Sequence, residues 1–135
     1  MSCYNQFMTT EEYLKHWQIT ASEDLQTAKS LFKLKRFHHC LFFCHLALEK
    51  IIKGLVYKNT KKHALPIHNL LKLSQQAKIQ IDDVRQKELE EISTWNIQAR
   101  YDDIKREFYK KASNEFAKLW LVKVESLYLW FKKQY

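Results

Sequence analysis

The stretch that decides the fold is residues 37–57, FHHCLFFCHLALEKIIKGLVY. Gly54 lies inside this stretch and is interpreted as a small-residue position within a helix, not as its end. The apolar surface of this stretch, like that of the C-terminal segment, is wider than one narrow helix stripe. This width suggests a surface for self-association as well as a core. The apolar residues recur at the three- and four-residue spacing of a helix face: Leu41, Cys44, Leu48, Ile51, Ile52, Leu55 and Val56.

The composition of the whole chain agrees with a helical fold. Its 135 residues include one glycine, Gly54, and one proline, Pro66. Sheets and doubly wound folds need these residues at many turns, so a chain with one of each is expected to have few, long elements. We predict a single all-α domain over residues 1–135.

Further helices are predicted on both sides of the central stretch. Their starts are expected near Thr9 or Thr10, at Pro66, at Asp82, and near Ser113 or Asn114. Residues 98–111 have poor periodicity and are interpreted as a loop or a frayed helix end. The expected fold is an antiparallel up-and-down bundle of four long helices plus one short helix.

The positive charge is concentrated in one part of the chain. The net charge is +8, and residues 29–62 contain nine bases and one acid, whereas the remaining residues have equal numbers of each. Such a segment, including a predicted basic loop at 58–65, suits a steering or docking surface for nucleic acid, a nucleotide or an acidic partner. It can equally be the solvated face of ordinary helices.

Several classes of protein are excluded by what the sequence lacks. No stretch is long and apolar enough for a membrane span, and the N-terminus does not resemble a secretory signal, so we expect a cytoplasmic protein. A single glycine cannot build a P-loop or a Rossmann turn. No glutamate precedes a histidine by three residues, as a di-metal site in a helical bundle requires. In the looser cluster of His38, His39 and His45, adjacent histidines point about 100° apart on a helix and cannot both face one ion with His45. No metal site and no cofactor are expected.

Two pairs of polar residues share faces of the central helix. His45 and Glu49 are four residues apart, so the carboxylate can orient the imidazole; the alternative is a buried pair that fixes helix register. Lys50 and Lys53 are three apart and can either hold a phosphate or face solvent. His68 completes this candidate set.

Three stretches in a fixed order resemble the HEPN family of small helical nucleotide-binding domains. The first is residues 42–55, FFCHLALEKIIKGL, the second is residues 66–73, PIHNLLKL, and the third is residues 99–101, ARY. Asp24, Leu25 and Ala28 are similar to the opening helix of that family. The resemblance implies an up-and-down bundle, a homodimer, and a prokaryotic chain often encoded beside a minimal nucleotidyltransferase in a toxin-antitoxin-like pair.

Many members of that family are metal-independent ribonucleases that use an arginine followed a few residues later by a histidine. Arg100 matches the arginine, and the histidine is expected at position 105, 106 or 107. These positions hold Lys105, Arg106 and Glu107. Because lysine and arginine stay protonated at neutral pH, they can bind a phosphate but exchange no proton readily.

The leading hypothesis is therefore a dimeric HEPN-like protein that binds a nucleotide, RNA or a nucleotidyltransferase and lacks full ribonuclease activity. Its expected ligand-binding residues are Arg100, Tyr101, Lys105, Arg106 and Tyr109, with the two tyrosines as acceptors for a transferred nucleotidyl group. One alternative is a ribonuclease in which His45 or His68 replaces the missing histidine. Another is a purely structural dimeric module without a ligand.

Overall fold

The computed structural model describes residues 8–98 and 102–135. Within these ranges every regular element is an α-helix and there is no strand, which confirms the predicted all-α class. The helices are α2 (Thr10–Lys33), α3 (Phe37–Thr60), α4 (Leu70–Gln76), α5 (Asp83–Gln98), α6 (Asp102–Lys111) and α7 (Asn114–Lys132).

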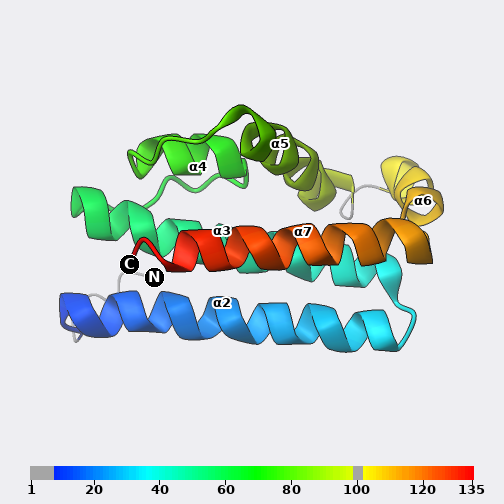
Figure 1. Ribbon diagram of the computed structural model, residues 1–135, viewed down its shortest axis with the longest axis horizontal. Coiled ribbons are helices and arrows are strands. Elements are labelled where there is room, and N and C mark those ends of the chain that lie inside the picture. The colour runs from blue at the N-terminus through cyan, green and yellow to red at the C-terminus, as the bar shows by residue number, and fades with distance from the viewer. Residues whose placement is uncertain (1–7, 99–101) are drawn as a thin grey trace.

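The long helices α2, α3 and α7 lie side by side along the length of the molecule (Figure 1). The chain turns back from α2 into α3, and α4 and α5 lie on the side of α3 that faces away from α2. Helix α5 runs back to the end of the bundle where α3 begins. For this reason α7 runs in the same direction as α3. The short helix α6 lies at the end of the bundle that also contains the α2–α3 turn.

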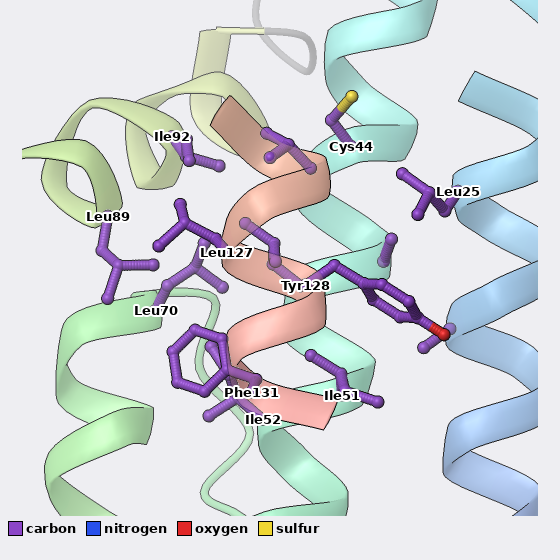
Figure 2. Close-up of a cluster of buried hydrophobic side chains, with 14 of the residues drawn as sticks. Leu25, Cys44, Ile51, Ile52, Leu70, Leu89, Ile92, Leu127, Tyr128 and Phe131 are labelled. Carbon is purple, nitrogen blue, oxygen red and sulfur yellow. The ribbon is translucent and has the colours of Figure 1, made fainter. Parts of the chain in front are cut away.

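The helix α3 forms the centre of the bundle, because it contacts each of the other described helices. Figure 2 shows side chains from α2, α3, α4, α5 and α7 meeting around it, with Leu25, Leu70 and Phe131 among them. The wide apolar surface predicted for this helix is therefore used inside the chain. Cys40 and Cys44 are buried in it as free thiols.

Gly54 allows a close approach of α2 and of the C-terminal Tyr135 to α3. A Cβ atom built there would lie 2.8 Å from Cβ of Trp17 and 2.0 Å from the hydroxyl oxygen of Tyr135. That hydroxyl donates a 2.6 Å hydrogen bond to the carbonyl oxygen of Ile51, and burial raises the pKa of Tyr135. Gly54 is thus a packing position inside α3, as the sequence predicts.

Three of the described helices are followed by a lysine in the backbone conformation that glycine usually adopts at a helix end. Lys35, Lys61 and Lys78 follow α2, α3 and α4 with φ angles of 60°, 60° and 61°, the left-handed region that glycine usually occupies. At the first of these ends, the amide of Lys35 donates to the carbonyl of Phe32, and that of Arg36 to the carbonyl of Leu31. A chain with one glycine still makes these tight turns because lysine adopts the left-handed conformation instead. Each such lysine costs about 1 kcal/mol.

The helix starts follow side-chain caps at Thr9, Asn69, Asp82 and Ser113. The predicted start at Pro66 was wrong: α4 begins at Leu70, because Oδ1 of Asn69 accepts a 3.0 Å hydrogen bond from the amide of Lys72. The central helix also extends to Thr60, three residues into the predicted basic loop.

The interpretation of residues 98–111 as a loop or a frayed end was also wrong, because α6 occupies 102–111. Phe108, 1% exposed, and Ala112, 6% exposed, hold it against the core. With Ile104, these residues have a four-residue spacing that indicates a helix, although the dense charges around them obscure it. The fold thus has one more short helix than predicted.

Candidate functional site

Glu49 is the centre of a polar cluster in the middle of α3. Its Oε1 atom lies 2.8 Å from Nδ1 of His68, and its Oε2 atom lies 3.0 Å from Nζ of Lys53. Burial raises the pKa of Glu49, but the hydrogen bonds from His68 and Lys53 outweigh it and keep the pKa below its ordinary value. The cluster therefore contains a carboxylate that ties the α3–α4 connection to α3.

His45 completes this cluster from one helical turn earlier. Its Nε2–H donates to the carbonyl oxygen of His68 at 2.9 Å, since a carbonyl can only accept. Its Nδ1 atom lies 3.8 Å from Oε1 of Glu49. The side chain is fully buried, and burial lowers the pKa of His45. The structure thus brings together three predicted residues, His45, Glu49 and His68. Their hydrogen bonds hold the α3–α4 connection against α3.

Lys50 and Lys53 are not brought together over a common anion site. Nζ of Lys50 lies 2.8 Å from a carboxylate oxygen of Asp24 on α2, whereas Lys53 pairs with Glu49. Both lysines contribute to the neutralisation of acids within the bundle. Sequence reasoning noted Asp24 only as part of a resemblance and missed this pairing across helices.

The basic segment 29–62 is not one continuous surface. Lys29 pairs with Glu125 at 2.7 Å, and Lys50 and Lys53 are paired as described. The other bases lie near the two ends of α3, which are about 36 Å apart for a helix of this length. Lys33, Lys35 and Arg36 lie at the α2–α3 turn, and Lys58, Lys61 and Lys62 lie at the opposite end.

Three rings form a stack where α6 meets the first turn of α3. The ring of Tyr109 lies 3.7 Å from that of His38, and the ring of His38 lies 3.8 Å from that of His39, both as centroid distances. His38 is 8% exposed between its neighbours, whereas Tyr109 is 51% exposed and His39 is also exposed. Sequence reasoning found Tyr109 but did not include the two histidines among the candidate ligand-binding residues.

Two exposed arginines lie on the elements that carry this stack. Arg36 precedes the first residue of α3, and Arg106 lies one helical turn before Tyr109 on α6; both are exposed. Neither forms an ion pair with a carboxylate in the part of the chain that the structure describes. The two elements therefore place guanidinium groups and aromatic rings at one end of the bundle.

The remaining predicted ligand-binding residues are not covered by this geometry. Arg100 and Tyr101 lie outside the described residues, and the side chain of Lys105 is likewise not described.

Among the described residues, no three histidine, cysteine, aspartate or glutamate side chains are grouped to hold a metal ion. None of the described helices has the length and hydrophobicity that a membrane crossing requires.

The family model of the HEPN domain matches residues 14–134. The chain belongs to the HEPN family. The match includes nearly all of the chain and confirms the resemblance carried by residues 42–55, 66–73 and 99–101. HEPN membership supports a function related to nucleotides or RNA in general. No curated protein and no solved structure shows a significant match to this HEPN chain.

Proposed function

We propose that this protein binds a nucleotide or RNA, acts as the dimeric partner of a minimal nucleotidyltransferase in a toxin-antitoxin-like pair, and lacks full ribonuclease activity. The observation that carries the binding proposal is the surface between α3 and α6 in a HEPN chain. There, Arg106 and Tyr109 face solvent beside the basic α2–α3 turn. Guanidinium groups bind phosphate through paired N–H donors, and exposed rings bind bases, so this surface suits a nucleotide ligand.

The absence of full ribonuclease activity is proposed from the residues that follow Arg100. In the family motif a histidine supplies a titratable group near neutral pH, whereas this chain has Lys105, Arg106 and Glu107. Two cations strengthen phosphate binding but provide no group that both accepts and donates a proton at pH 7. Binding without turnover is the expected outcome.

The test uses labelled single-stranded RNA with the purified protein in EDTA. We expect the protein to retain the RNA, with an affinity that falls steeply as the salt concentration rises. We expect no more RNA cleavage than with an Arg100→Ala control. Cleavage that disappears in Arg100→Ala would overturn the proposed lack of activity. If neither RNA nor a nucleotide is retained at low salt, the protein is a structural module.

A second candidate function is a ribonuclease that takes its imidazole from α3. His38 lies against Tyr109 of α6, and the exposed His39 lies against His38. The histidines considered from the sequence are less suitable: His45 is fully buried, and His68 is tied to Glu49 about 16 Å further along α3 than His38. EDTA-resistant cleavage that is lost in His39→Ala and kept in His68→Ala would favour this candidate.

The proposed partner can be tested separately. Tyr109 is accessible to an enzyme, with 51% of its surface exposed, and Tyr101 is the second candidate acceptor. After co-expression with a nucleotidyltransferase encoded beside this chain, we expect a nucleotidyl mass on the peptide that spans residues 98–111. An unmodified peptide from a stable complex would leave the partnership intact and exclude the modification.

A further inference from the structure

We infer that Tyr109 and His39 form a stacking surface for a nucleobase, and that Arg36 and Arg106 bind the phosphates next to that base in single-stranded RNA. The inference rests on the proposed function and deepens it, because it names the residues that contact the base. It is based on the ring geometry between α3 and α6; of its four residues, only Arg106 also lies in the family motif that begins at Arg100.

The ring contacts define the shape of this surface. His38 contacts Tyr109 at an interplanar angle of 38° and His39 at 44°, so the rings are tilted relative to one another and His38 fills the space between them. His38 is buried between the other two rings and contacts their inner sides. His39 and Tyr109 are exposed, so their outer faces can contact a ligand. A base stacked on an aromatic ring is held without sequence preference, since every base has a π face.

The position of the cations suits a ligand that alternates bases and phosphates. Arg36 is separated from His39 by one turn of α3, and Arg106 is separated from Tyr109 by one turn of α6. Arg106 and Tyr109, three residues apart, share a face of α6, so the cation and the ring can contact one ligand. Lys33 and Lys35 add positive charge at the α2–α3 turn.

The opposite end of α3 shows why basic and aromatic residues alone do not define such a surface. Tyr13, Tyr57 and His63 meet there beside Lys61 and Lys62, but their contacts are used within the bundle. Tyr13 is only 5% exposed, and its hydroxyl lies 3.2 Å from Nδ1 of His63. At the α6 end, by contrast, the outer tyrosine is half exposed.

The experiment measures the affinity of the full chain for a short labelled oligouridylate, with Tyr109→Ala, Tyr109→Phe and Lys62→Ala as variants. Tyr109→Phe retains the ring, and Lys62→Ala removes an exposed cation from the opposite end. We expect Tyr109→Ala to weaken binding about tenfold and Tyr109→Phe to stay within about twofold of the natural chain. Arg106→Ala should reduce the slope of log affinity against log salt by about one.

Loss of α6 packing is the main confounding effect, and a second variant controls for it. Phe108 and Ala112 anchor α6 in the core, so melting followed by circular dichroism should show only a small loss of stability in Tyr109→Ala. His39→Ala removes an exposed ring on α3 and should weaken binding about threefold without touching α6. Unchanged affinity in both ring variants would overturn the stacking surface.

The two proposals fail in different ways. If the natural chain binds neither the oligouridylate nor ATP at low salt, the proposed function fails. If it binds, but Tyr109→Ala and Tyr109→Phe lose affinity equally, the hydroxyl and not the ring makes the contact, and the stacking inference alone is overturned. ATP that competes with the oligouridylate only in chains with an intact ring would show that a free nucleotide uses the same surface.

Discussion

The middle of α3 and the end where α3 meets α6 both contain histidines and cations, but these residues make different contacts. In the middle, His45, Glu49 and Lys53 are buried or nearly so, and their polar atoms are directed at one another and at His68. In the first turn, the polar ring of His39 faces solvent, next to cations that have no carboxylate partner in the described ranges.

This difference shows how a ligand surface can be separated from a structural cluster in a small helical protein. A buried carboxylate with its partners in place has little left to offer a ligand, since its lone pairs are already used. Exposed cations with no carboxylate partner in the described ranges, and rings that are largely exposed, keep that capacity. The middle of α3 is therefore assigned to stability, and the end with α6 to binding.

The largest expected effect on stability is at Glu49. Glu49→Gln leaves Lys53 without its carboxylate and weakens the hold on His68, so we expect a loss of about 2–3 kcal/mol in the free energy of unfolding, measured with urea. Glu125→Gln breaks the exposed pair with Lys29 and should cost less than about 0.5 kcal/mol. Equal losses in both variants would contradict a structural role for the buried cluster.

The same cluster predicts that stability falls in acid. The folded-state pKa of His45 is lowered by burial from its ordinary value of 6.5, so below pH 6.5 the unfolded chain binds a proton more readily than the folded chain. The free energy of unfolding should therefore decrease as the pH is lowered below 6.5, by at most about 1.4 kcal/mol per pH unit for this proton. Glu49, with its pKa below the ordinary value of 4.5, adds a further loss below pH 4.5.

His45→Gln tests the assignment of this pH dependence, because the amide can still donate to the carbonyl oxygen of His68. In this variant the free energy of unfolding, measured by urea titration at a series of pH values, should change less between pH 6.5 and 4.5. A slope identical to that of the natural chain would assign the acid sensitivity to another group.

The smallest predicted effect compares two lysines in the left-handed conformation. Lys35→Gly and Lys78→Gly should each raise the free energy of unfolding by about 0.5 kcal/mol, since glycine adopts this conformation without strain. In RNA titrations at several salt concentrations, only Lys35→Gly should lower the salt dependence, because Lys78 follows α4, away from the α6 end. Destabilisation by both variants would contradict the strain argument.

The sequence predicted the fold well because its main signals are local. Caps such as Thr9 and Ser113 and the apolar spacing of α3 determine helices irrespective of their neighbours. α6 was missed because its helical signal consists of a few apolar positions among many charges. The left-handed lysines could not be predicted, since glycine is the usual residue there.

The candidate site was predictable only in part, because its geometry depends on which helices meet. The grouping of His45, Glu49 and His68 could be anticipated, but that it closes on itself depends on the approach of the α3–α4 connection. His38 and His39 acquire significance only through the contact of α6 with the first turn of α3, which no spacing in the sequence predicts. The division of the basic segment into two ends likewise follows from helix length and pairing.

The most direct test of binding at the α6 end compares two charge reversals of equal size. Arg106→Glu changes the end where α3 meets α6, and Lys62→Glu changes an exposed cation at the opposite end, so both variants have the same net charge. Affinity for single-stranded RNA at moderate salt should fall at least tenfold in Arg106→Glu and less than about threefold in Lys62→Glu. Equal losses, or a larger loss in Lys62→Glu, would contradict a binding surface at the α6 end.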